Sequence, residues 1–146
     1  MKIRELEKSD IDDILDIRVS TIENHFSMED LAEVGVTPKA IAEWLDGTVK
    51  GWVCEVSGRP VGFAMADSET AEVLVAACYP EYEKKGIGKK LMHKVHDWLW
   101  SFNHEQIWLW SDPDPGIRAY GFYRRLGYQP AGKIKGNDEM LILKKK

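Results

Sequence analysis

A chain of 146 residues with an apolar fraction of 44% is long enough and apolar enough for one domain, residues 1–146, and it is not a disordered chain. The formal net charge of −4 argues against a general nucleic-acid binder, because such proteins need surplus Lys and Arg to neutralise phosphates. No apolar run is long enough to span a membrane, and the first residues form no apolar signal region, so we expect a cytoplasmic protein. The two cysteines, Cys54 and Cys78, lie in apolar stretches without the spacing of a disulfide framework or a metal site, so we expect two buried small side chains and no metal.

The first elements are predicted to be a short strand followed by helices. Lys2–Leu6 alternates as a strand does, and Ser9 is expected to cap the next helix with Asp12 as its capping-box partner. Helical spacing gives that helix one apolar face, formed by Ile11, Ile14, Leu15, Val19 and Ile22. Residues 23–36 are irregular, with a short helical turn expected near Met28–Val34.

The middle of the chain is predicted to change from helix to strand. Thr37 before Pro38 is a strong helix start, and that helix is expected to end at Gly47. Three strands follow, the first two joined as a hairpin at Ser57-Gly58: Gly51–Val56, Pro60–Ala66 and Glu72–Tyr79. The third is apolar almost throughout, which predicts a strand buried on both faces.

A long helix and further strands complete the prediction. The helix follows Gly86 and Gly88, runs to about residue 102, and has an inner stripe of Ile87, Leu91, Val95, Trp98, Leu99 and Phe102. A strand at Ile107–Trp110 precedes a helix that is expected to open at Asp114-Pro115 and to end at Gly127. Two final strands are expected at 128–133 and 139–143. The element order β-α-α-β-β-β-α-β-α-β-β predicts a mixed α/β fold around one central sheet.

Gly86 and Gly88 are the most informative residues for chemistry, because they open a long helix directly after an apolar strand. Glycines remove Cβ atoms, so successive backbone N–H groups can point at one anion, and a helix N-terminus favours a phosphate there. A Walker A loop would need Ser or Thr after Lys89, and a Rossmann loop would need a third glycine where Leu91 stands. The remaining alternative is an ordinary glycine-rich start of a helix.

Two segments resemble the signatures of the GNAT family of acyl-CoA-dependent N-acyltransferases. Residues 83–88, EKKGIG, resemble its motif A, in which Gln or Arg is followed by two variable residues, Gly, one variable residue and Gly or Ala. Residues 118–128, RAYGFYRRLGY, resemble its second signature, an Ala followed by FYxxLGF. The order and spacing match the family over nearly the whole chain. The resemblance implies the family fold, with acetyl-CoA in a V-shaped split between the fourth and fifth strands.

The resemblance also implies which residues hold the donor. The backbone of Ala76, Ala77 and Cys78 is expected to pair with pantetheine. The pyrophosphate is expected on the amides of six consecutive residues: Lys84, Lys85, Gly86, Ile87, Gly88 and Lys89. The lysines among them add charge near the phosphates or are simply solvated. Glu83 departs from the family pattern and is expected to turn away or to pair with a lysine, and Gly116 replaces an Asn that contacts pantetheine in many members.

For the reaction, the resemblance implies Tyr123 as the general acid, because a phenol stays protonated at pH 7 and can donate to a departing thiolate. Packing in the interior is the structural alternative for Tyr123, and Tyr120 is the second candidate for the acid. A backbone N–H of Ala76 or Ala77 is expected to stabilise the oxyanion. No base is determined, since Ser111 stands where some relatives have a Glu. The side chains that could border the acceptor are Glu72, Asp67, Glu23 and His25.

The expected function is transfer of an acetyl group from acetyl-CoA to a primary amine of a small molecule or a peptide, by direct attack in a ternary complex. Residues 23–36 and 133–138 are expected to form the acceptor side, whose acidic stretch attracts a cationic amine or is merely solvated. Trp108 and Trp110 share a strand face and either wall a pocket or pack in the core. The alternatives are a non-catalytic acyl-CoA sensor and a transferase of a longer acyl group. A homodimer through exposed aromatics such as Trp52 or Trp100 is also an expectation.

Overall fold

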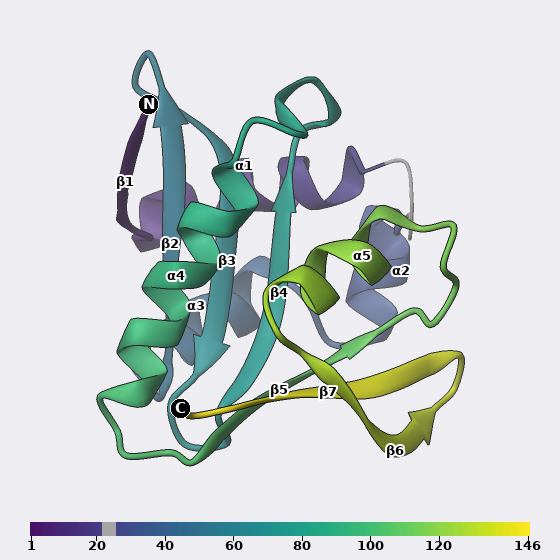
Figure 1. Ribbon diagram of the computed structural model, residues 1–146. Coiled ribbons are helices and arrows are strands. Elements are labelled where there is room, and N and C mark those ends of the chain that lie inside the picture. The colour runs from purple at the N-terminus through teal and green to yellow at the C-terminus, as the bar shows by residue number, and fades with distance from the viewer. Residues whose placement is uncertain (22–25) are drawn as a thin grey trace.

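The computed structural model describes residues 1–21 and 26–146, and the strands in these ranges form one seven-stranded sheet in the order β1-β2-β3-β4-β5-β7-β6 (Figure 1). The strands are β1 Lys2–Glu5, β2 Val49–Val56, β3 Arg59–Asp67, β4 Glu72–Cys78, β5 Gln106–Ser111, β6 Gln129–Lys135 and β7 Asp138–Lys144. The helices are α1 Ile11–Val19, α2 Met28–Glu33, α3 Pro38–Asp46, α4 Ile87–Trp100 and α5 Arg118–Arg125. Neighbouring strands are antiparallel except β4 and β5, which run parallel. The predicted mixed α/β fold around one sheet is confirmed.

Helices cover both faces of the sheet and enclose the core. Figure 1 shows α4 and α5 in front of the strands, with α1 and α3 behind them. The spacing of apolar residues in α4 explains its packing, because its buried side chains recur at three- and four-residue intervals. They are Ile87, Leu91, Met92, Val95, His96 and Leu99. The prediction for Phe102 is wrong: α4 ends at Trp100, and Phe102 is 48% exposed.

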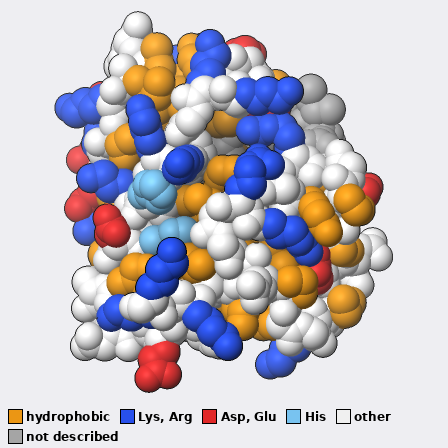
Figure 2. Space-filling model, in the orientation of Figure 1, with side chains coloured by type: hydrophobic (Ala, Val, Ile, Leu, Met, Phe, Trp, Pro, Cys, Tyr) orange, Lys and Arg blue, Asp and Glu red, His pale blue; other side chains and the backbone are white. Residues whose placement is uncertain are grey.

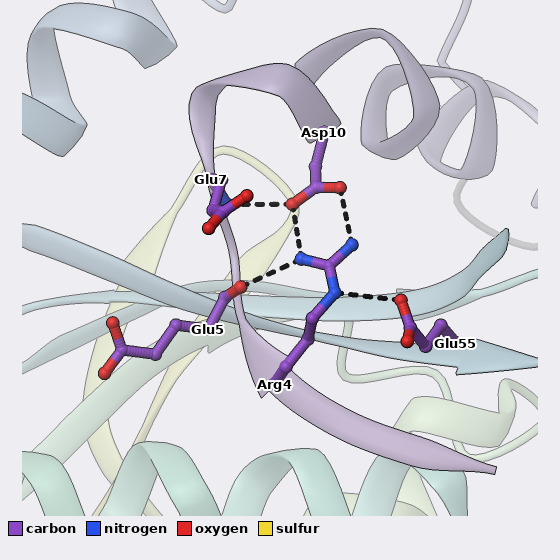
Figure 3. A network of polar contacts seen from close by, with 5 residues as sticks. All are labelled: Arg4, Glu5, Glu7, Asp10 and Glu55. Atoms are coloured by element: carbon purple, nitrogen blue, oxygen red, sulfur yellow. Dashed lines mark hydrogen bonds and ion pairs between the residues drawn. The ribbon is translucent and has the colours of Figure 1, made fainter. Parts of the chain in front are cut away.

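The start of α1 depends on a partly buried ion pair rather than on Ser9. The Asp10 carboxylate accepts hydrogen bonds from both terminal nitrogens of Arg4, at 2.8 and 2.9 Å, and from the backbone N–H of Glu7 at 2.8 Å (Figure 3). Nε of Arg4 donates to Glu55 on β2 at 2.8 Å. Because Asp10 takes these bonds, Lys8–Asp10 forms a short 3-10 helix that precedes α1. The predicted cap at Ser9 is therefore wrong, whereas the predicted cap of α3 is confirmed, since Thr37 accepts the N–H of Ala40 at 3.1 Å.

The start of α5 also differs from the prediction, which placed it at Asp114-Pro115. The carboxylate of Asp112 accepts the N–H of Asp114 at 2.9 Å, and that of Asp114 accepts the N–H of Gly116 at 2.9 Å. Short acidic side chains that bond two residues ahead stabilise turns in place of a helix. Residues 112–117 therefore form a loop, and α5 begins at Arg118.

Burial corrects three further expectations. β4 is not buried on both faces: Val73 is its one fully buried residue, and Leu74 is 37% exposed. Trp52 is buried, so it offers no exposed surface to a second copy, whereas Trp100 is partly exposed. Cys54 is fully buried as expected, but Cys78 is only half-buried.

Among the helices that the structure describes, none combines the length and the apolar character needed to cross a membrane.

Candidate active site

β4 and β5 diverge almost as soon as they have paired. Within the described ranges, their register consists of the single pair Glu72 and Trp108. Further along, β4 is paired only with β3, opposite Ala64, Phe63 and Gly62. The backbone edge that faces β5 is consequently open at the three residues expected to meet pantetheine, Ala76, Ala77 and Cys78. A register shift between β3 and β4 lies just before this part of the strand, since the consecutive residues Met65 and Ala66 pair with Val75 and Val73, and it adds local twist there.

The loop after β4 turns its backbone into a concave shape at the start of α4. Lys84 and Gly86 both adopt left-handed conformations, with φ of 63° and 80°. The first N–H of α4 to reach a helical acceptor is that of Lys90, which donates to the carbonyl of Gly86 at 3.2 Å. The N–H groups of the first helical turn have no acceptor inside the helix. The six residues predicted to cradle a pyrophosphate therefore lie together around this helix N-terminus.

The two glycines of this loop are required for different reasons. A Cβ built on Gly86 would meet nothing within 4 Å, so the left-handed backbone is what favours glycine there. A Cβ built on Gly88 would lie 3.1 Å from Cζ of Phe122 on α5. Gly88 thus lets α5 approach the start of α4, and it brings the two predicted signatures into contact.

Positive charge surrounds the loop. Lys84, Lys85 and Lys89 are exposed, and Nζ of Lys85 lies 5.9 Å from the ring centroid of Tyr82. Figure 2 shows Lys and Arg side chains spread over this face, with few Asp or Glu among them, although the whole chain carries a net charge of −4. Of the two alternatives expected for Glu83, pairing with a lysine is wrong, because its carboxylate pairs with an arginine.

The partner of Glu83 is Arg118, the first residue of α5, whose guanidinium lies 3.5 Å from the carboxylate. The pair joins the loop to α5 and turns the negative charge of Glu83 toward that helix.

Gly116, the second departure from the family pattern, lies where a Cβ would be 3.3 Å from the carboxylate of Asp114. The limited space beside the Asp114 carboxylate therefore favours glycine at position 116.

Tyr123 is held on α5 by aromatic contacts. Its ring lies edge-on to those of Phe122 and Tyr128, with centroid distances of 5.1 and 5.7 Å. Burial raises the pKa of Tyr123 to about 12, and the positive charge of Arg18 on α1 opposes that rise. The phenol therefore keeps its proton at neutral pH, as a general acid must. Arg18 is a neighbour that sequence reasoning missed, because no local pattern relates α1 to α5.

A buried, hydrogen-bonded pair, His96 and Tyr128, packs against Tyr123 through the Tyr128 ring. Nε2 of His96 and the hydroxyl of Tyr128 share a hydrogen bond of 2.7 Å, and both side chains are buried. Burial lowers the pKa of His96 to about 4 and raises that of Tyr128. The sequence reasoning overlooked this pair, although His96 falls four residues after Met92 on the inner side of α4.

The candidates for a second titratable group differ in their surroundings. Glu72 is half-buried where β4 and β5 diverge, and burial raises its pKa. Asp67 is engaged in a turn, where it accepts the Thr48 hydroxyl at 2.7 Å and the N–H of Glu69 at 2.9 Å. The other two predicted candidates, at positions 23 and 25, lie outside the described residues. Of the two candidates that the structure describes, Glu72 has the setting of a reactive carboxyl group.

Tyr120, the second candidate for the acid, is covered by a cation. The guanidinium of Arg124 lies 3.6 Å from the Tyr120 ring centroid and also pairs with Glu139 at 2.9 Å.

The tryptophans of β5 do share one strand face, as predicted. The rings of Trp108 and Trp110 meet edge-on at 5.9 Å, and both side chains are half-buried.

Comparisons with known proteins show the family and the fold of this chain. Residues 11–128 match the sequence model of the Acetyltransferase (GNAT) family. An uncharacterized N-acetyltransferase of Archaeoglobus fulgidus is 30% identical over 138 residues, with 84% of this chain and 89% of that protein covered. One of Methanocaldococcus jannaschii is 31% identical over 94 residues, covering 58% of this chain but only 41% of that longer protein. The chain is similar in fold to PaiA N-acetyltransferase from Thermoplasma acidophilum, whose crystal structure was solved in complex with coenzyme A. The TM-score is 0.84 and the sequence identity is 16%, and the match covers 99% of this chain and 100% of that one.

Proposed function

Since the chain belongs to the acetyltransferase (GNAT) family, we propose that it transfers an acetyl group from acetyl-CoA to a primary amine by direct attack in a ternary complex. One observation carries the proposal: the open edge of β4 is followed, after the short 3-10 helix Pro80–Tyr82, by the left-handed loop at the start of α4. The contact between Gly88 and Phe122 brings Tyr123, the next residue, to the same end of α4. Backbone donors and a protonated phenol are thereby gathered around one strand end.

The donor is bound mainly by backbone. We assign the pantetheine to the open edge of Ala76, Ala77 and Cys78, since an extended chain can add to a strand edge by main-chain hydrogen bonds. We assign the pyrophosphate to the amides of residues 84–89, where free N–H groups and the helix dipole favour an anion. This assignment tolerates Glu83, because its carboxylate is paired with Arg118.

Acid catalysis is assigned to Tyr123, and stabilisation of the oxyanion to a backbone N–H of Ala76 or Ala77. As the C–S bond breaks, the phenol donates its proton to the leaving thiolate, and a phenol carries this proton throughout the neutral pH range. A fixed N–H aimed at the carbonyl oxygen stabilises the negative charge that develops there.

Base catalysis is assigned to Glu72. An amine is mostly protonated at neutral pH, so it must lose a proton before it attacks the thioester. Burial raises the pKa of Glu72, which makes this carboxylate a stronger base than a solvated one. Its place at the point where β4 and β5 diverge supports contact with the acceptor, directly or through a water molecule.

Calorimetric titration with acetyl-CoA and CoA tests the donor site, and a thiol-release screen across polyamines, amino acids, aminoglycosides and peptides tests the reaction. We expect binding, followed by thiol release with one class of amine. Glu72→Gln should lower turnover about 100-fold, whereas Glu69→Gln, an exposed neighbour, serves as the matched control. Binding without release by any amine would favour an acyl-CoA sensor, and absence of binding would contradict the proposal.

A further inference from the structure

Trp108 and Trp110 lie on the face of β5 that α5 leaves uncovered. Arg124 of α5 pairs with Glu139, whose register partner on β5 is Ser111. Registered partners in antiparallel strands point to the same face, so α5 covers the face that carries Ser111. Side chains alternate along a strand, which puts both tryptophans on the opposite face.

Lys135 extends its ammonium group toward one of these tryptophans, Trp110. Its Nζ lies 5.8 Å from the ring centroid of Trp110, within the range of a cation–π contact. Two carboxylates are paired in the sheet with residues of this face. Glu72 is the register partner of Trp108, and Asp138 is the register partner of Lys135. Burial raises the pKa of both carboxyl groups, and the charge of Lys135 opposes each rise, as expected of a cation close to both.

This arrangement gives an internal primary amine the surroundings that an external acceptor needs. An aromatic face binds the cation, and a half-buried carboxylate can take its proton. Lys135 is exposed and directly precedes the turn at Gly136. Its unbranched side chain can therefore change direction without disturbing the core.

We propose, on the basis of the proposed function, that Lys135 is an internal acceptor, which the protein acetylates on Nζ when no external amine is present. The ammonium gives a proton to Glu72, and the nitrogen lone pair then forms a C–N bond with the acetyl carbon. The C–S bond breaks, and the thiolate takes a proton from Tyr123. The nitrogen gives its second proton to the Tyr123 phenolate, which restores the phenol, and Glu72 releases the first proton to water.

The experiment is peptide mass spectrometry of the full chain after incubation with acetyl-CoA alone. We expect the acetyl group to accumulate at Lys135 faster than at any other lysine. The rate should not depend on protein concentration, because the transfer is intramolecular. Propylamine, a small primary amine, should slow this modification by competing for the Trp110 face.

Lys133→Arg is the matched control, since Lys133 is an exposed lysine of the same strand, and it should leave modification of Lys135 unchanged. Tyr123→Phe and Glu72→Gln should each slow acetylation of Lys135 by about 10-fold or more without slowing that of Lys133. Equal rates at the two lysines, or no effect of either substitution, would overturn the inference. If Lys135 stays unmodified with acetyl-CoA alone while an external amine still supports thiol release, this inference alone is overturned. Absence of acetyl-CoA binding would overturn the proposed function as well.

Discussion

The ring of Phe122 lies so close to Gly88 that a Cβ at position 88 would be 3.1 Å from its Cζ. The two residues are far apart in the sequence, and each belongs to a different signature. Their contact fixes the distance between α5 and the N-terminus of α4, and therefore the position of Tyr123 relative to the loop that is proposed to bind the donor.

Gly88→Ala should weaken CoA binding and lower stability. The added methyl group must displace the Phe122 ring, and overpacking of this kind costs about 1 to 3 kcal/mol. Calorimetric titration with CoA and urea unfolding measure the two effects. The double variant with Phe122→Leu restores space and should recover most of both losses; if it recovers neither, the contact is not the cause.

Gly86→Glu should abolish CoA binding by placing a carboxylate in the proposed phosphate cradle. Position 86 has open space for a Cβ, so the control must separate backbone strain from charge. Gly86→Ala imposes the left-handed strain alone, at a cost of about 1 to 2 kcal/mol. We expect titration to show measurable CoA binding by the Ala variant and none by the Glu variant. Equal affinities would locate the phosphates elsewhere.

Tyr123→Phe should lower turnover about 100-fold while leaving CoA affinity nearly unchanged. Phenylalanine preserves the edge-on contacts with Phe122 and Tyr128, so the helix should keep its position. Because the pKa of Tyr123 is raised to about 12, the wild-type phenol should not deprotonate below pH 10. Steady-state rates and CoA titrations on both proteins provide the check, and unchanged turnover would remove the acid role.

Asp10→Asn should destabilise the fold by about 2 to 3 kcal/mol, because it leaves Arg4 without its main partner beside Glu55. The Arg4 guanidinium lowers the pKa of Asp10 below its ordinary value of 3.8. A lowered carboxyl pKa stabilises the fold above the ordinary value, and this contribution is lost as pH falls through the lowered one. Urea unfolding at pH 7 and at pH 3 should show a smaller difference between the two proteins at the lower pH.

His96→Gln should flatten the pH dependence of stability between about pH 4 and 6.5. Burial lowers the pKa of His96 from 6.5 to about 4, so in this window the unfolded chain binds a proton that the folded protein does not. Wild-type stability should therefore rise with pH across the window, by up to about 3 kcal/mol. Glutamine can still bond to Tyr128 but does not titrate. An unaltered slope in urea unfolding would show that His96 is not the titrating group.

The sequence was sufficient for the order of the strands and of the longer helices and for the loop at the start of α4, whereas α2 is expected from it only as a short helical turn. These features depend on local chemistry, such as the Thr37 cap, the turn at Ser57-Gly58 and a glycine pair at a helix start. Local rules failed where a distant partner competed for the same group. Asp10 binds Arg4 and so replaces Ser9 at the start of α1, and loop hydrogen bonds of Asp112 and Asp114 delay α5.

Tertiary structure alone decided which side chains meet around the site. The apolar composition of β4 predicted a strand that is buried on both faces. In the structure β4 diverges from β5, so the backbone edge of β4 that faces β5 is open. Composition cannot encode the angle between two strands. The pairing of Glu83 with Arg118 and the approach of Lys135 to Trp110 both join segments that are distant in sequence. Contacts of this kind depend on how the sheet twists and how α5 packs on α4, so they emerge only when the whole chain has folded.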